Sequence, residues 1–241
     1  MAVQVRRIGT SVIGSIWTGA KMSLNRPKAP AINRISRLSA TSLSSIVHKT
    51  FAESLSAIFS MSATKDVTAV PEYYFTVKIA EALAVSLAKD RIVRMEWPAS
   101  TLISSADAIQ PGRLARHIRH NGRADISIFS RGYEQPEAVI EVKRHVYSAC
   151  SGPEADIQRL TATLARAPHR NSIRYGLFAF STFTNVNDAK ARIQHIKSRL
   201  AHYHQIADRG GLLKITTSFK EVTGLECDDH VLTGVSILQR A

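Results

Sequence analysis

Cysteine, long apolar runs and acidic residues near the N-terminus are all scarce in this sequence of 241 residues. The two cysteines, Cys150 and Cys227, belong to no CxxC or Cys/His pattern, which argues against a disulfide framework or a zinc site and favours a reducing compartment. No run approaches the roughly 18 apolar residues that a membrane span requires. We therefore expect a soluble, cytoplasmic protein. The sequence also contains no phosphate-cradling glycine loop, no nucleophile elbow and no internal repeat.

Basic residues are in clear excess, with 32 Lys and Arg against 19 Asp and Glu, for a formal net charge of +13. Such an excess favours a polyanionic partner, because Lys and Arg that neutralise phosphates release condensed counterions. About half of the excess lies in residues 1–60, where eight basic residues face Glu53 alone.

Residues 1–60 are rich in serine, arginine and lysine, and Pro27 and Pro30 interrupt any long helix. Sustained periodicity begins only at the stretch SLSSIVHKTFAESLSAIF. We therefore predict a disordered or poorly packed basic extension over residues 1–60, either a basic arm or sequence upstream of a start at Met61. An organelle-targeting peptide is the alternative, and residues 61–241 form the predicted domain.

Beyond Met61 the apolar periodicity predicts a regular succession of elements. We expect helices over residues 72–89, 152–167 and 187–209, the last with a glycine stop, and strands over residues 91–98, 124–129, 137–142, 173–183, 212–219 and 231–238. The order is helix, three strands, helix, strand, followed by a further helix and two strands.

The stretch GRADISIFSRGYEQPEAVIEVK, residues 122–143, combines two apolar strands with acidic residues near one end. Side chains alternate along a strand, so Glu141 and Lys143 share one face while the opposite face is apolar. If Phe129 pairs with Glu137 in a hairpin, Asp125 lies opposite Glu141 at about 5.5 Å between β carbons. Two close carboxylates repel unless a cation lies between them, and Mg²⁺ prefers such oxygen ligands. The pattern indicates a metal site for phosphodiester hydrolysis.

Asp125, a loop and then Glu141-Val142-Lys143 at the end of an apolar strand resemble the PD-(D/E)xK nuclease superfamily, which includes restriction endonucleases and Holliday junction resolvases. The resemblance implies Mg²⁺-dependent cleavage, in which Mn²⁺ can substitute. It implies metal ligation by Asp125, Glu141 and the carbonyl of Val142, and a lysine, Lys143, beside the attacking water. The sequence departs from the family pattern at Ala124, which replaces the nominal proline.

The resemblance covers roughly residues 70–181 and implies a fold. The expected class is α/β, with a restriction endonuclease-like three-layer core (α-β-β-β-α-β). Its central mixed sheet is flanked by helices, and a C-terminal helix and strands follow.

The family often adds a glutamate from the first helix. At 100° per residue, Glu72 lies on the same face as Ile79 and Leu83, whereas Glu81 lies on the opposite face. Glu72 is therefore the preferred catalytic candidate, ahead of Glu81 and of Glu96 in the first strand.

Candidate nucleic-acid contacts lie in two segments. GRLARHIRHNGR spaces Arg113, Arg116 and Arg123 on one basic stripe, and EADIQRLTATLARA could direct Gln158 or Arg159 at a phosphate.

The sequence predicts a metal-dependent phosphodiesterase that acts on nucleic acid, in first place DNA, either alone or as a homodimer. One alternative is an inactive nucleic-acid-binding module of the same fold, which would be favoured by carboxylates that are splayed apart or salt-bridged away from the cleft. The other is a scaffold subunit, which would be favoured if Asp125 and Glu141 lay on opposite faces.

Overall fold

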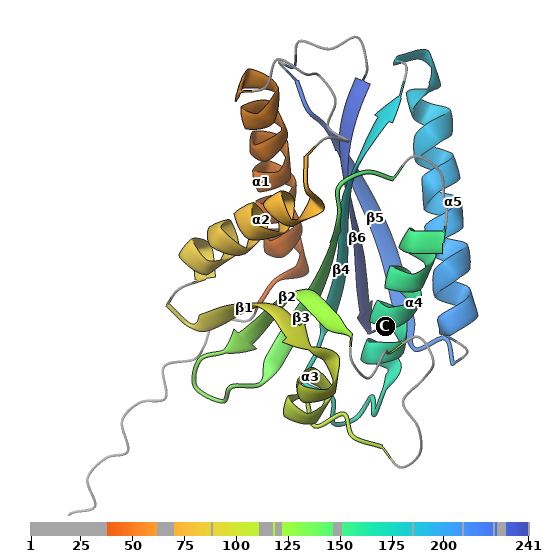
Figure 1. Cartoon of the computed structure of the whole chain (residues 1–241). Coiled ribbons are helices and arrows are strands. Elements are labelled where there is room, and N and C mark those ends of the chain that lie inside the picture. The colour runs from red at the N-terminus through yellow and green to blue at the C-terminus, as the bar shows by residue number, and fades with distance from the viewer. Residues whose placement is uncertain are drawn as a thin grey trace, which may run out of the picture. The chain divides into compact units, whose positions relative to one another are not determined.

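Helices and strands follow one another in this protein in close agreement with the apolar periodicity (Figure 1). The computed structural model describes residues 38–61, 70–87, 89–110, 118, 122–146, 151–184, 186–208, 210–223, 225 and 230–240. Its elements are α1 (Ala40–Met61), α2 (Glu72–Leu87), β1 (Arg91–Pro98), α3 (Ala99–Ser105), β2 (Arg123–Ser130), β3 (Pro136–Lys143), α4 (Ser151–Ala165), β4 (Tyr175–Thr184), the 3₁₀ turn η2 (Val186–Asp188), α5 (Ala189–Ala207), β5 (Leu213–Glu221) and β6 (His230–Arg240).

The strands form one open, mixed sheet of six strands in the order β1-β2-β3-β4-β6-β5. Only β3 and β4 are parallel, and α4 makes the crossover between them. The other neighbours are antiparallel. The protein is therefore an α/β fold, as the sequence predicts.

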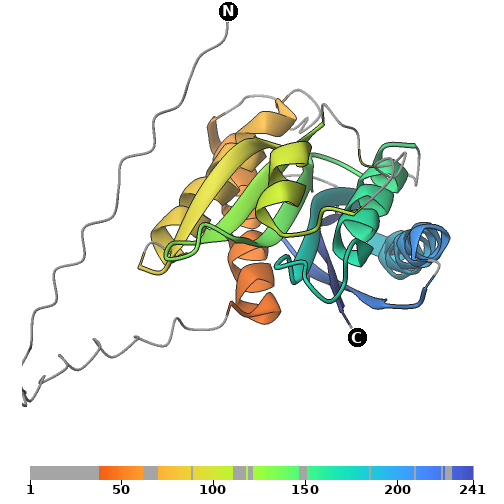
Figure 2. The same cartoon turned by 90° about the horizontal axis from the view of Figure 1, so that it is seen from below.

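Helices cover both faces of the sheet, as the views in Figures 1 and 2 show. One apolar core joins α1 and α2 to the sheet, and it contains the β3 residues Ala138, Ile140 and Val142. The other core joins α3, α4 and α5 to the opposite face, which carries Val139. The predicted alternation of β3 is confirmed, so Glu141 belongs to the face covered by α4.

Helix α1 corrects the predicted domain boundary at residue 60. Leu43, Val47, Phe51 and Leu55 are fully or almost fully buried, at a spacing of four residues that places them on one face. The Phe51 ring stacks on Phe75 of α2 with 4.6 Å between centroids. A chain that began at Met61 would lose this part of the core, so residues 40–60 are not a poorly packed extension. Residues 1–37 lie outside the described part of the chain.

The β2–β3 hairpin has the predicted register over three pairs, Ile126↔Ile140, Ser127↔Val139 and Ile128↔Ala138. The predicted pair of Phe129 with Glu137 is wrong, because a bulge shifts Phe129 opposite Pro136. Proline has no N–H to offer a strand ladder, and a bulge at the strand end accommodates it.

Two local features complete the fold. The polar stretch after Pro98 contains a short helix, α3, which the sequence did not predict and which buries Leu102 and Ile103. Helix α5 ends at Ala207 with Asp208 as its C-cap, and the predicted glycines follow in the turn, where Gly211 has a φ of +61°. Within the described residues, no helix has the length and apolar character needed to cross a membrane.

Candidate functional site

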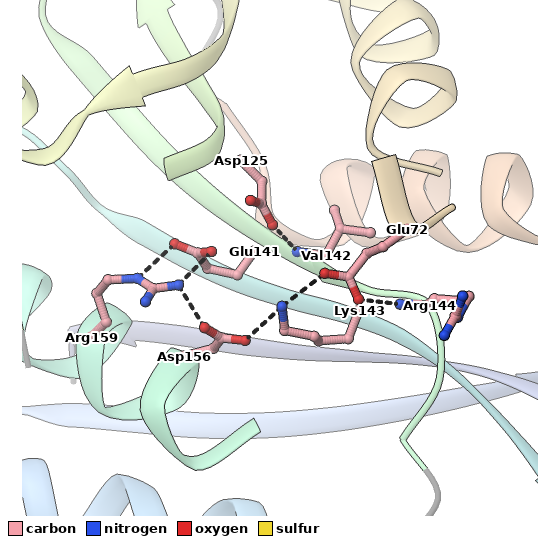
Figure 3. Close-up of polar contacts among 8 residues, drawn as sticks. All are labelled: Glu72, Asp125, Glu141, Val142, Lys143, Arg144, Asp156 and Arg159. Carbon is pink, nitrogen blue, oxygen red and sulfur yellow. Dashed lines mark hydrogen bonds and ion pairs between the residues drawn. The ribbon is translucent and has the colours of Figure 1, made fainter. Parts of the chain in front are cut away.

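Strands β2 and β3 stop pairing at the end where the acidic residues lie. Their last paired positions are Ile126 and Ile140, and the register puts Asp125 and Glu141 next, on one face, as predicted. The Asp125 carboxylate replaces the missing ladder bond, because the N–H of Val142 donates to Asp125 Oδ2 at 2.7 Å (Figure 3). The two strands therefore open at this end.

The backbone of Val142 also faces this opening. The N–H and C=O of one strand residue point toward the same neighbouring strand. Because the N–H of Val142 meets Asp125, its carbonyl is directed to the same side. The role of the Val142 carbonyl as a metal ligand stays a prediction.

Glu141 points away from Asp125, toward α4, and is held by Arg159. Arg159 Nε donates to Glu141 Oε1 at 3.0 Å, and Arg159 Nη2 donates to Glu141 Oε2 at 2.7 Å. Burial raises the pKa of Glu141 to about 8, although the hydrogen bonds and charge of Arg159 favour its ionised form. The same contacts outweigh the effect of burial on Arg159 and raise its pKa. This pair is the salt-bridged arrangement named above as favouring an inactive module.

Asp156 of α4 is a buried member of the site that the sequence did not reveal. Its Oδ1 accepts from Arg159 Nη2 at 2.5 Å, and its Oδ2 lies 3.4 Å from Lys143 Nζ. Within the described residues, this Oδ2 is a buried oxygen without a hydrogen-bond partner. Asp156 lies one helical turn before Arg159, which is the signal that could have linked it to the site.

Lys143 lies between carboxylates from two helices. Its Nζ donates to Glu72 Oε1 at 2.9 Å and approaches Asp156 as described above (Figure 3). The other oxygen of Glu72 accepts from the N–H of Arg144 at 3.0 Å. Burial alone would lower the pKa of Lys143, but the charges of Asp156, Glu72 and Asp125 outweigh it and raise the pKa. The ammonium group is therefore kept protonated.

Of the three candidate glutamates, Glu72 is the one that contacts the predicted residues. Glu81 lies on the exposed face of α2 and pairs with Lys78 at 3.1 Å. Glu96 lies at the β1 position across from Asp125 and has a φ of +50°, which is unusual for a residue with a side chain.

The charge of Glu96 also acts on Asp125. Burial raises the pKa of Asp125, the hydrogen bond from Val142 opposes this effect, and the negative charges of Asp156 and Glu96 add to it.

The predicted nucleic-acid contacts have different outcomes. Arg113 and Arg116 lie outside the described residues. Arg123 is exposed at the first position of β2. Gln158 is buried and donates to Glu154 at 3.0 Å, and Arg159 holds Glu141 and Asp156.

Negative charge exceeds positive charge among the side chains that form the site. Three carboxylates, those of Glu72, Glu141 and Asp156, are bound to two cationic side chains, and that of Asp125 accepts from a backbone N–H. No three His, Cys, Asp or Glu residues of the described part of the chain are arranged around a common point that could hold a metal ion. The predicted residues thus meet at one place, but Arg159 and a backbone N–H engage their oxygens. Comparison of the chain with protein-family models, curated proteins and solved structures finds no match.

Proposed function

We propose that this protein is a metal-dependent nuclease of the PD-(D/E)xK type, which hydrolyses phosphodiester bonds of nucleic acid, in first place DNA. The observation that carries the proposal is the meeting of Asp125, Lys143 and Glu72, from three different elements, where β2 and β3 separate. Glu141 lies on β3 across from Asp125 of β2, one position beyond the last paired residues of the two strands. Three acids and a lysine at the open end of a sheet are the chemistry that such hydrolysis requires.

The topology supports the same proposal. Apart from the short helix α3 between β1 and β2, the succession α2, β1, β2, β3, α4, β4 has the order expected of a restriction endonuclease-like core, including the parallel pair β3 and β4. Helix α1 adds to the layer of α2, and α5, β5 and β6 extend the opposite layer and the sheet.

The oxygen atoms at this site are of the chemical type that binds a divalent cation. Carboxylates and a backbone carbonyl are the hard oxygen ligands that Mg²⁺ prefers. Asp156 Oδ2 lacks a hydrogen-bond donor, and the Arg159 guanidinium is a cation already held by Glu141 and Asp156. Asp125, Glu141 and the carbonyl of Val142 would hold Mg²⁺ or Mn²⁺. The bound ion would polarise the phosphoryl group and stabilise the charge that develops on it.

Lys143 would act as a fixed positive charge and not as a base. Asp156 and Glu72 raise its pKa, so the ammonium group keeps its protons at neutral pH. It would orient the attacking water by donating a hydrogen bond, while Glu72 and Asp156 hold the ammonium group in position.

The test is a cleavage assay on labelled linear, single-stranded and branched DNA and on RNA, with Mg²⁺, Mn²⁺ or EDTA. The full chain is used, because α1 belongs to the core. We expect metal-dependent cleavage that falls more than about 100-fold in Asp125→Ala, since even residues that only support metal ligands cost 10- to 100-fold. Glu81→Gln, which removes a carboxylate from the exposed face of α2 away from the opening, is the matched control and should cut normally.

A second candidate is a nucleic-acid-binding module without catalysis. The bidentate pair of Arg159 with Glu141 favours it, because this pair occupies both oxygens of a predicted metal ligand. The net charge of +13 suits either function. Equal binding of nucleic acid by wild type and Asp125→Ala, with no cleavage by either, would establish this alternative over the nuclease.

A further inference from the structure

Arg159 joins two carboxylates that come from different elements. It donates to both oxygens of Glu141 on β3 and to one oxygen of Asp156 on its own helix (Figure 3). Two buried carboxylates around one buried cation resemble a metal site in which a side chain takes the place of the ion. The second oxygen of Asp156 is buried, has no hydrogen-bond partner in the described residues and lies 3.4 Å from the ammonium group of Lys143, so it is a further oxygen that a cation could bind at this place.

The three side chains differ in how far solvent reaches them. Glu141 is 2% exposed and Asp156 is 6% exposed, whereas Arg159 is 18% exposed. A ligand in solution can therefore reach the cation more readily than the two anions. An incoming phosphate group would meet Arg159 first.

There is no room for a metal ion and its waters beside Arg159. The cavity that Glu141 and Arg159 line with Leu102, Val139 and Leu160 has a volume of about 10 Å³. A single water needs roughly 10–15 Å³. A divalent cation could reach Glu141 from this side only after the guanidinium has moved.

The charges make such a movement conditional. Without Arg159, the buried carboxylates of Glu141 and Asp156 would keep Lys143 as a nearby positive charge but lose their bound guanidinium. Buried charges are costly unless a partner compensates them, so another cation or a proton must replace the guanidinium. Guanidinium groups bind phosphate with two parallel hydrogen bonds, which makes a nucleic-acid phosphate a suitable new partner for Arg159.

We propose that Glu141 and Asp156 form a divalent-cation site, which Arg159 fills until a phosphate group of the nucleic acid binds its guanidinium. This inference rests on the proposed nuclease function and adds Asp156 as a ligand. It also makes metal binding depend on the substrate, since the free protein holds the metal weakly and the substrate phosphate promotes metal binding. Metal binding would then follow substrate binding.

The first test measures Mn²⁺ binding to the full chain by calorimetric titration without nucleic acid. Arg159→Gln is expected to bind Mn²⁺ at least about tenfold more tightly than wild type, because the competing cation is gone. Adding Asp156→Asn to this variant should reverse the gain. Arg174→Gln, which also removes one positive charge from an arginine paired with a glutamate of β3, is the matched control and should leave Mn²⁺ affinity unchanged.

The second test measures binding of a labelled DNA duplex by fluorescence anisotropy in Ca²⁺ as salt is varied. Arg159→Gln should bind about tenfold more weakly, and the slope of log affinity against log salt should fall by about one phosphate contact. If the exchange occurs, Arg159→Gln gains metal affinity and loses nucleic-acid affinity. If Arg159 is purely structural, its replacement does not raise the metal affinity.

Mn²⁺ affinity of Arg159→Gln within threefold of wild type would overturn this inference, as would unchanged nucleic-acid affinity. If wild type cuts nucleic acid and Asp125→Ala does not, the nuclease proposal stands even when the exchange fails. If wild type does not cut but Arg159→Gln still gains Mn²⁺ affinity through Asp156, the cation site stands and the nuclease proposal fails.

Discussion

Strand β3 carries two glutamates on the same face, and their surroundings differ in the balance of charge. Glu137, at the start of the strand, is held by two arginines, Arg91 of β1 and Arg174 before β4. Glu141, near the end, shares Arg159 with a second buried acid, Asp156. One end has more cations than anions, and the other has more anions than cations.

The difference separates a structural ion pair from a candidate site. Through Glu137, Arg91 ties β1 to β3 across the intervening β2, and Arg174 ties the segment before β4 to β3, so every charge there has a partner. At the other end the strands open and the acids exceed the cations, which burial makes unfavourable. A protein retains such an arrangement at a cost in stability, and a cation-dependent function gives it a reason.

The largest expected effect is at Glu137, at the start of β3. Glu137→Ala removes the carboxylate that both Arg91, which is 4% exposed, and Arg174 bind. We expect the free energy of unfolding to fall by about 3–5 kcal/mol, as when one partner of a buried pair is removed. Urea denaturation measures the loss, and Glu81→Ala on the exposed face of α2 serves as the control. A loss below about 1 kcal/mol would show that the two ends do not differ as described.

The next effect is a pH dependence at the acid-rich end. Because the pKa of Glu141 is raised to about 8 in the folded protein, its contribution to stability is full below its ordinary pKa of 4.5 and is lost as pH rises toward 8. Between about pH 5.5 and 7.5, wild type should lose about 3 kcal/mol relative to Glu141→Gln. Unfolding free energies measured at several pH values test this, and parallel curves for the two proteins would contradict it.

His48 of α1 should produce a smaller pH dependence of stability with the opposite sign, which must be separated from that of Glu141. His48 forms hydrogen bonds with the hydroxyl groups of Thr233 at 2.8 Å and Ser218 at 2.9 Å. Burial, together with the charge of Lys220, lowers the pKa of His48 to about 4. Its contribution to stability is present above its ordinary pKa of 6.5 and is lost as pH falls. By pH 5 we expect about 2 kcal/mol of loss relative to His48→Gln, measured by denaturation at matched pH. A pH profile unchanged by the substitution would show that the pKa of His48 is the same in the folded and the unfolded protein.

The smallest effect is expected at Arg174, the exposed partner of Glu137. Arg174 is 37% exposed, and Arg91 remains bound to Glu137 when Arg174 is replaced. Arg174→Gln should therefore cost less than about 1 kcal/mol in urea denaturation. A cost as large as that of Glu137→Ala would mean that Arg91 alone does not compensate the glutamate.

Local periodicity accounts for what could be predicted. The alternation of β3 places Glu141 and Lys143 on one face, and the helical spacing of α2 turns Glu72 inward, because backbone geometry sets both periods. The apolar spacing of α1 carried the same signal, but its serine-rich, basic surroundings led to its assignment to the extension. Composition was a poorer guide there than periodicity.

The sequence by itself determined the order of helices and strands from α2 onward apart from α3, the face on which Asp125 and Glu141 lie, and the preference for Glu72 over Glu81. Only the tertiary structure decided that α1 completes the core, that the β2–β3 hairpin opens at its acidic end, and that Asp156 and Arg159 join the site. The physical reason is that a residue's position on its own element follows from local geometry. Contacts between elements far apart in the chain depend instead on how those elements pack.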